Sequence, residues 1–123
     1  MTEGLILFAH GARDPLWSRP FEAVAQRILS RRPDVRVSLA YLEFMSPHLN
    51  EAADRLAAEG CTRVAVVPLF LGAGGHVRRD LPLLLEGLRQ RHPGVQWLLR
   101  SAIGEADSVI EAMAIEAASA LQS

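Results

Sequence analysis

Hydrophobic residues along the chain alternate between short continuous runs and helically spaced stripes. Each of four strand-like runs is followed by a segment whose apolar residues recur at the spacing of a helix face. The strand-like runs cover residues 4–9, 35–42, 63–71 and 95–100, and the helix-like segments cover residues 17–32, 46–60, 76–91 and 104–121. The third run is the most continuously apolar, so we expect it to be a central strand covered on both faces.

A regular alternation of strands and helices is typical of a parallel sheet joined by right-handed crossovers. We therefore predict an α/β fold in which a single domain, residues 1–123, forms a four-stranded parallel sheet with helices on both faces. Ser46 is expected to cap the second helix, with Pro47 at its first position. The helix residues expected to face the core are Phe21, Val24, Ala25, Ile28, Leu29, Leu49, Ala52, Ala53, Leu56, Leu81, Leu84, Leu85, Leu88, Val109, Ile110, Met113 and Ala117.

The composition fits one compact domain and argues against a membrane segment. The chain has 123 residues, of which 50% are hydrophobic and 22% are charged. Its longest apolar run, residues 64–71, contains Pro68 and is far shorter than the roughly 20 residues that a membrane-spanning helix needs. Residues 1–4 lack the basic opening of a signal peptide, so we expect a cytoplasmic protein.

The charge balance argues against nucleic-acid binding as the function. The formal net charge is −1, whereas a general nucleic-acid binder would be strongly basic. All 13 basic residues are arginine, whose forked donors suit carboxylates and phosphates better than lysine does. The single cysteine, Cys61, cannot form a disulfide within the chain or build a thiolate zinc site, and we expect a small buried or half-buried residue there.

Three candidate ligands follow the first three strands. His10 comes directly after the first strand, Glu43 after the second, and His76 after the glycine-rich segment that ends the third. The three are equally spaced along the chain, as expected if each lies one strand–helix unit beyond the last. Ligands of open α/β sheets bind beyond the carboxyl ends of the strands, so these side chains are expected to share one edge.

The residue types in this set suit metal chemistry. Two imidazoles and a carboxylate bind borderline divalent metals such as cobalt, nickel, iron or zinc, and histidine also accepts protons near neutral pH. Each residue has an ordinary alternative: a core histidine for His10, a helix cap for His76 and a solvated carboxylate for Glu43. The glycines beside His76 favour the close approach of a ligand.

Three sequence segments resemble a known enzyme family. They are LILFAHGARDP at residues 5–15, YLEFMSP at residues 41–47 and PLFLGAGGHVRRDLP at residues 68–82. In order and spacing they are similar to the small class II tetrapyrrole chelatases, the CbiX/SirB-type sirohydrochlorin cobaltochelatases and ferrochelatases. The glycine loop followed by H-V-x-x-D-x-P is the most specific of these matches.

This resemblance implies that His10 and His76 are metal ligands and proton acceptors, with Glu43 as their carboxylate partner. It implies a lyase that inserts Co²⁺, Fe²⁺ or Ni²⁺, as substrate, into sirohydrochlorin in cobalamin- or siroheme-type biosynthesis. It also implies a homodimer that binds the tetrapyrrole in a cleft between its halves.

Candidate contacts to the tetrapyrrole follow from charge and from the glycine loop. Arg13, Arg78 and Arg79 are expected to meet the carboxylates of the ring, while Gly74 and Gly75 allow its close approach. No nucleotide is expected, because the GAGG segment lacks the Lys-Ser/Thr ending of a phosphate-binding loop.

Other functions compete with this interpretation. Many chelatase relatives have a hydroxyl residue after His-Gly where this chain has Ala12, so a non-catalytic metal or tetrapyrrole carrier remains the alternative. A histidine phosphatase would need an arginine before His10, where Ala9 stands, and no G-x-S-x-G elbow of a serine hydrolase occurs. His48 is expected to be structural or solvent-facing, and His92 a surface turn residue.

Overall fold

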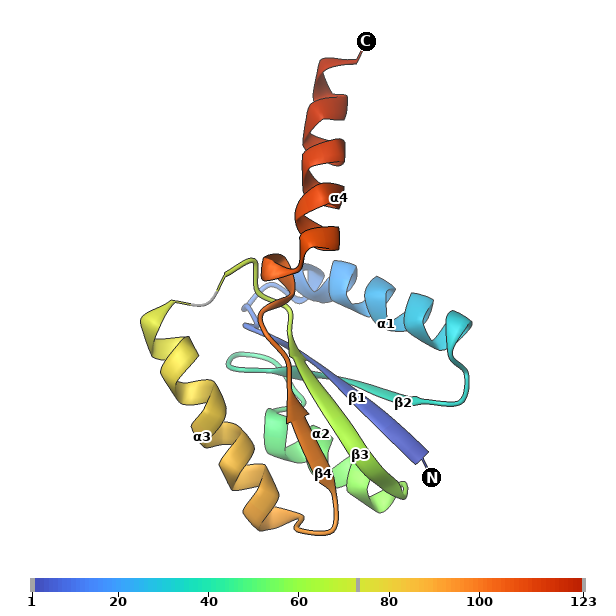
Figure 1. The fold of residues 1–123 in the computed structure, drawn as a ribbon, viewed down its shortest axis with the longest axis vertical. Coiled ribbons are helices and arrows are strands. Elements are labelled where there is room, and N and C mark those ends of the chain that lie inside the picture. The colour runs from blue at the N-terminus through green and yellow to red at the C-terminus, as the bar shows by residue number, and fades with distance from the viewer. Residues whose placement is uncertain (1, 73, 123) are drawn as a thin grey trace.

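The computed structural model describes residues 2–72 and 74–122 and folds them around one sheet (Figure 1). The strands are β1 (Thr2–Ala9), β2 (Arg36–Tyr41), β3 (Cys61–Pro68) and β4 (Gln96–Leu99). The helices are α1 (Arg19–Arg31), α2 (Leu49–Ala58), α3 (Gly75–Arg91) and α4 (Asp107–Ala118), with the 3₁₀ turns η1 (Pro15–Ser18), η2 (Ile103–Glu105) and η3 (Ser119–Leu121).

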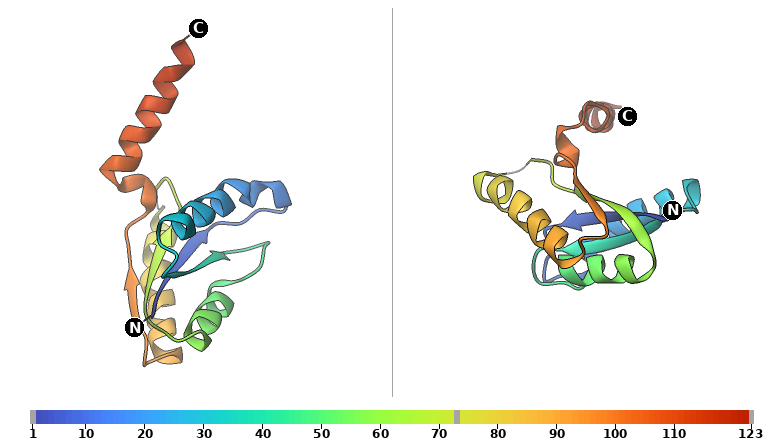
Figure 2. Two further views of the ribbon diagram at one scale, coloured as in Figure 1. Left: turned by 90° about the vertical axis from the view of Figure 1, so that its right-hand side faces the viewer. Right: turned by 60° about the horizontal axis from the view of Figure 1, so that its bottom comes forward.

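The strand order is β2-β1-β3-β4, and every pair of neighbouring strands is parallel. α1 lies on one face of the sheet and α2 and α3 lie on the other (Figure 2). The predicted α/β fold, a four-stranded parallel sheet with helices on both faces, is therefore confirmed. The chain passes from β1 to β2 and then back across β1 to β3, so the strand order reverses between β1 and β3. Open sheets of this kind bind ligands at such a reversal.

The hydrophobic core lies between the sheet and the helices α2 and α3. The strands contribute Ile6 and Phe8 from β1 and Val64 and Val66 from β3, each at most 1% exposed. The helices contribute Leu49, Ala52, Ala53 and Leu56 from α2 and Leu81, Leu85 and Leu88 from α3. Complete burial of one large aliphatic side chain stabilises a fold by roughly 1.5–3 kcal/mol, so this face holds the domain together.

The opposite face of the sheet is covered only in part. α1 packs mainly against β2, and Val24 on its expected inner stripe is 41% exposed. Ala65 and Val67 of β3 are only half-buried on this face, although β3 is an inner strand. The expectation of a third strand covered on both faces is therefore wrong for a single chain, because α1 does not extend over β3 and β4.

α4 departs most from the expected packing. It projects away from the sheet instead of folding back on it (Figures 1 and 2). The prediction that Val109, Ile110, Met113 and Ala117 face the core is wrong, since Ile110 is 48% exposed and Met113 is 39% exposed. Backbone hydrogen bonds hold the segment between β4 and α4 across the carboxyl end of β3, and this segment directs the helix outwards.

Two expectations at helix ends also need correction. α2 begins after His48, whose backbone N–H donates to the Glu51 carboxylate over 3.0 Å, so His48 rather than Ser46 is the N-cap. Residues 42–47 form a loop whose end is held against the end of β2, and the helix starts only beyond it. The expected first helix opens as the turn η1, which Asp14 caps.

His92 is a half-buried C-cap of α3, so its prediction as a surface turn residue is wrong. Its Nε2 lies 2.6 Å from the carboxylate of Asp54 on α2, which also accepts a hydrogen bond from Arg91. Trp97 of β4 donates to the His92 carbonyl over 3.2 Å. Together these residues tie α2, α3 and β4 at the amino edge of the sheet.

Two further observations concern burial and membranes. Cys61 is 3% exposed, as predicted, and burial raises the pKa of its thiol. Across the described residues, no helix has both the length and the apolar character needed to cross a bilayer.

Candidate functional site

The candidate site lies at the carboxyl edge of the sheet, where loops leave three strands. His10 directly follows β1, Glu43 lies in the loop after β2, and His76 follows the segment that leaves β3. β1 and β3 are the two neighbours between which the strand order reverses. The structure thus places all three predicted residues beyond strand ends at this edge.

His10 is exposed to solvent and supported from below by an aromatic ring. Its imidazole stacks on Phe70, with the ring centroids 4.6 Å apart and the planes tilted by 37°. Phe70 is only 4% exposed and packs in turn against Phe8 of the core. In the described part of the chain, no hydrogen bond engages the imidazole nitrogens of His10. These nitrogens are therefore open to a proton or a metal ion.

Glu43 is joined to His10 through the backbone. Its N–H donates to the His10 carbonyl over 3.0 Å. Gly11 makes this approach possible, because it has a φ of +90° and a Cβ there would lie 1.9 Å from the Glu43 carbonyl oxygen. The same Cβ would touch Tyr41, the last residue of β2, where burial raises the pKa of the hydroxyl. The loops after β1 and β2 are thus locked together, while the Glu43 carboxylate remains exposed.

His76 is the second residue of α3, and its side chain is exposed. Gly74 is the N-cap of this helix, and a Cβ on it would meet no atom within 4 Å. A Cβ on Gly75 would make only an ordinary contact, at 3.8 Å from the Arg79 guanidinium. Packing within the chain therefore does not require glycine at either position, which leaves the approach of a ligand as their predicted role.

The three predicted ligands do not form a closed metal centre in one chain. Within residues 2–72 and 74–122, no three side chains of histidine, cysteine, aspartate or glutamate are grouped closely enough to hold a metal ion. His10 and Glu43 are neighbours through their backbones, whereas His76 comes from the start of α3. Their joint role as ligands stays a prediction.

The three candidate arginines lie in different environments. The Arg13 guanidinium lies 5.0 Å from the centroid of the Phe44 ring, and such a contact favours a cation over the ring face. Arg79 donates from Nε to the Gly75 carbonyl over 3.1 Å. Arg78 is paired with Glu105 of η2 at 3.5 Å, so part of its charge is already compensated.

Apolar side chains exposed near the carboxyl edge of the sheet form a surface that the sequence analysis did not single out. Phe44 is 57% exposed and Leu71 is 71% exposed, while Leu42 and Leu84 are 39% and 37% exposed. Leu84 was expected in the core. The sequence did contain an indication of this surface, because its hydrophobic runs continue past the ends of β2 and β3 into the loops that follow. Exposed apolar residues beside polar ones mark a ligand surface more often than scattered single residues do.

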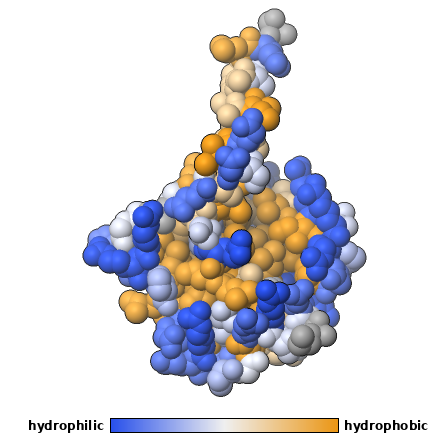
Figure 3. Space-filling model, in the orientation of Figure 1, coloured by the Kyte–Doolittle hydropathy of each residue, from blue (hydrophilic) through white to orange (hydrophobic). Residues whose placement is uncertain are grey.

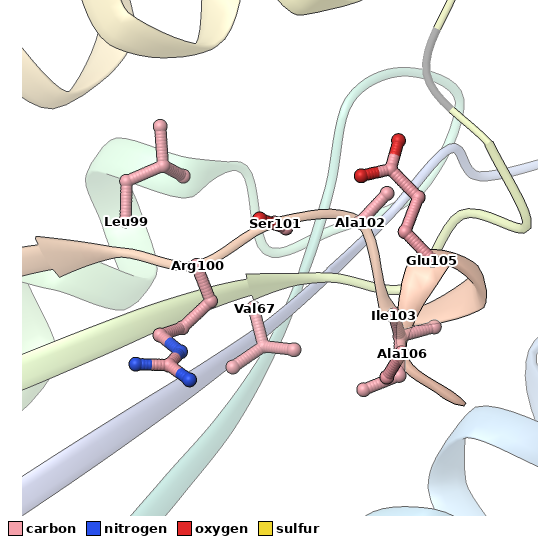
Figure 4. A pocket seen from close by; sticks show the side chains of 8 residues that line it. All are labelled: Val67, Leu99, Arg100, Ser101, Ala102, Ile103, Glu105 and Ala106. Carbon is pink, nitrogen blue, oxygen red and sulfur yellow. The ribbon is translucent and has the colours of Figure 1, made fainter. Parts of the chain in front are cut away.

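Apart from this surface, a hollow of about 650 Å³ lies where β4 leads into α4 (Figure 4). Its lining residues are Val67, Leu99, Arg100, Ser101, Ala102, Ile103, Glu105 and Ala106. None of the predicted ligand residues belongs to this lining.

The fold and the site together define a class of protein: a small α/β domain with an open histidine at the reversal of its parallel sheet. The CbiX family model matches residues 4–120, and the chain belongs to this family. It is 32% identical over 108 residues to the sirohydrochlorin cobaltochelatase of Sulfurisphaera tokodaii, covering 88% of this chain and 85% of that protein. It is 39% identical over 82 residues to the sirohydrochlorin cobaltochelatase of Saccharolobus islandicus, covering 67% of this chain and 62% of that protein. The resemblance found in the sequence is confirmed.

Solved structures agree with this assignment. A cobalamin (vitamin B12) biosynthesis CbiX protein from Marinobacter aquaeolei superimposes with a TM-score of 0.84 at 32% identity, over 98% of both chains. The sirohydrochlorin chelatase SirB of Bacillus subtilis, in complex with cobalt, superimposes with a TM-score of 0.81 at 21% identity. This chain covers 50% of that protein, so the likeness to SirB concerns the fold of one half.

Proposed function

We propose that this protein is a sirohydrochlorin chelatase that inserts a divalent metal ion, Co²⁺ or Fe²⁺ and also Ni²⁺, into the tetrapyrrole without a nucleotide. The observation that carries the proposal is His10: an open imidazole at the strand reversal, stacked on Phe70 and flanked by exposed apolar side chains. Membership of the CbiX family supports the substrate class. The reaction belongs to cobalamin- or siroheme-type biosynthesis, and we expect it in the cytoplasm.

The apolar surface suits one face of a tetrapyrrole ring. Leu42, Phe44 and Leu71 are exposed apolar residues in the loops after β2 and β3, at the edge where His10 stands. Arg13 and Arg79 stand at this edge with guanidinium groups that match carboxylates, so the acidic substituents of the ring would meet positive charge. Gly74 and Gly75 leave room for the ring close to the backbone.

Metal insertion requires a group that carries the metal ion and a group that takes protons. The metal ion, a substrate, docks on His10 and His76 with Glu43 offsetting its charge. As metal–nitrogen bonds form, the pyrrole N–H protons pass to the imidazoles or to water. Histidine suits this transfer, because its ordinary pKa lies near neutral pH.

The test is an anaerobic absorbance assay of metal insertion into sirohydrochlorin, with Co²⁺, Fe²⁺ and Ni²⁺ in parallel. Wild type is expected to accelerate insertion, and His10→Ala or His76→Ala is expected to lower the rate by about 100-fold or more, the usual size of a lost proton-transfer group. His92→Gln, a histidine at the opposite edge of the sheet, is the matched control and should keep the rate. Circular dichroism confirms that each variant is folded.

A non-catalytic carrier of metal or tetrapyrrole is the second candidate, because Ala12 stands where many relatives carry a hydroxyl. A carrier would bind the ring or the metal ion stoichiometrically without accelerating insertion. Tight binding by wild type together with an unchanged insertion rate for all three metals would replace the chelatase proposal with the carrier.

Two copies of the chain are needed for a cleft that covers both faces of a ring, so we extend the proposal to a homodimer. One copy presents a single open edge, and its described side chains group no three metal ligands. The SirB structure, in which this chain matches 50% of the protein, supports a two-half arrangement.

A further inference from the structure

Phe44 has an unusual backbone conformation for an aromatic residue. Exposed apolar side chains are common on this chain, as the body of the molecule below α4 shows, so exposure alone does not single out Phe44 (Figure 3). Its φ of +69° does, because no other non-glycine residue in the described part of the chain has a positive φ. Left-handed backbone is strained for a residue with a Cβ, and strain of this kind concentrates at functional sites.

Backbone contacts hold this strained turn in place. The Met45 N–H donates to the Glu43 carbonyl over 2.9 Å, which closes a tight three-residue turn with Phe44 at its centre. The Glu43 N–H is in turn bonded to the His10 carbonyl. Gly11 leaves room for this approach, since a Cβ there would collide with the Glu43 carbonyl oxygen. The turn is therefore fixed to the loop that follows β1.

The strained turn places the Phe44 ring against the guanidinium of Arg13. The Arg13 Cζ lies 5.0 Å from the ring centroid, and the two residues come from the loops after β2 and β1. Both residues are exposed, so the contact stands at the surface of the candidate site. A ring face attracts a cation without occupying its N–H donors, so the fork of Arg13 stays available to an acidic ligand.

Arg13 differs in this respect from the other two candidate arginines. Among the described residues, the ion pairs include no carboxylate partner for Arg13. Arg78 is paired with Glu105 at 3.5 Å, and Arg79 donates from Nε to the Gly75 carbonyl. Arg13 is therefore the candidate arginine that is held in position without using its donors.

We propose that Phe44 is a positioning residue: its strained turn holds the Arg13 guanidinium where Arg13 binds one carboxylate of the tetrapyrrole. A long side chain loses rotamer freedom when it binds a ligand, and a guanidinium that already rests on a ring face loses less. Phe44 and Arg13 then form a carboxylate subsite at the edge of the sheet. The inference rests on the proposed function, because it takes the acidic ligand to be the tetrapyrrole.

The first experiment measures the dissociation constant of sirohydrochlorin for the full chain, without metal, by anaerobic absorbance titration. Phe44→Leu keeps an apolar side chain but has no ring face, and we expect it to raise the constant about two- to fivefold. Phe44→Tyr keeps the ring face and should bind like wild type. Arg13→Ala should weaken binding about tenfold. Leu83→Ala on the outer face of α3 and Arg31→Ala at the end of α1 are the matched controls and should bind like wild type.

A double-mutant cycle separates positioning from a direct contact of Phe44 with the ring. If Phe44 acts through Arg13, Phe44→Leu should leave the dissociation constant of the Arg13→Ala chain unchanged. An effect of undiminished size in that background would overturn the inference, as would a Phe44→Leu single variant that binds like wild type. In the insertion assay, Phe44→Leu should raise KM and keep kcat, because Phe44 does not touch the reacting atoms.

The binding measurement also keeps this inference separate from the proposed function. A wild type that binds sirohydrochlorin but inserts no metal ion contradicts the chelatase alone, and the double-mutant cycle still decides the role of Phe44. A wild type that does not bind sirohydrochlorin contradicts both.

Urea unfolding distinguishes a positioning role from a structural one. Phe44→Gly removes the ring and tolerates left-handed backbone, so its urea midpoint should equal or exceed that of wild type. Its sirohydrochlorin binding should nevertheless weaken at least as much as that of Phe44→Leu. A midpoint that falls together with binding would mean that Phe44 supports the fold, and the positioning role would then be excluded.

Discussion

Gly11 shows how one missing side chain shapes the candidate site. It adopts a φ of +90°, and its bare Cα lets the loops after β1 and β2 meet. His10 and Glu43 are neighbours only because of this contact, since the Glu43 N–H bonds the His10 carbonyl. A side chain at Gly11 would force the two loops apart.

Gly11→Ala should therefore lower stability by about 2–5 kcal/mol, combining left-handed strain with overpacking. The matched control is Gly60→Ala, which has nearly the same φ of +91° but no atom within 4 Å of the added Cβ. It should cost only the strain, about 1–2 kcal/mol. Urea unfolding measures both, and equal losses in the two variants would show that the contact with Glu43 does not matter.

Asp54 of α2 accepts a hydrogen bond from Arg91 and lies 2.6 Å from His92 Nε2. Hydrogen bonds from Arg91, and then from His92, hold the pKa of this carboxyl well below its usual range. The folded-state pKa is depressed, so the stabilisation is present above the unfolded pKa of about 3.9 and is lost as pH falls through the lower folded value. The pair is 49% and 41% exposed, which limits its value to about 1 kcal/mol or less.

Asp54→Asn should reduce the free energy of unfolding by up to about 1 kcal/mol at pH 7. The difference from wild type should narrow steadily as pH falls below about 4, where the unfolded carboxyl takes up its proton. Urea unfolding of both proteins across this range measures the difference. A gap that widens in acid would mean that the carboxylate is not the stabilising form.

At the scale of elements, consecutive leucines of α3 differ in burial more than the sequence suggests. Leu85 is 1% exposed within the core, whereas the neighbouring Leu84 is 37% exposed beside the candidate site. Leu83, on the outer face, is 71% exposed. Leucines in consecutive positions look alike in the sequence, and only their contacts separate the core from the ligand surface.

Leu85→Ala should destabilise the domain by about 2–5 kcal/mol, because it opens a cavity between α3 and the sheet. Leu83→Ala is the control on the same helix and should change stability by no more than about 0.5 kcal/mol. The midpoints of urea unfolding give both values. Similar losses at the two positions would mean that Leu83 is covered in the assembled protein.

At the scale of the whole molecule, the proposed homodimer would make stability a property of two chains. If folding and assembly are coupled, the melting temperature depends on protein concentration. We expect a rise of about 3 °C for each tenfold increase in concentration, given the entropy of unfolding of a dimer of this size. Scanning calorimetry at three concentrations decides, and a wild-type melting temperature that does not move would contradict an obligate dimer.

The sequence by itself determined the order of strands and helices, the parallel sheet and the core stripe of α2. It also determined that His10, Glu43 and His76 follow strand ends. These features depend on hydrophobic spacing and on chain order, which are local properties.

Only the tertiary structure decided which apolar residues are buried and where α4 points. The stacking of Phe70 under His10 and the contact of Gly11 with Glu43 join residues far apart in the chain. The outward course of α4 follows from backbone bonds between its entry segment and β3. The apolar composition of α4 favours burial but does not specify which surface covers the helix, because the hydrophobic effect is non-directional.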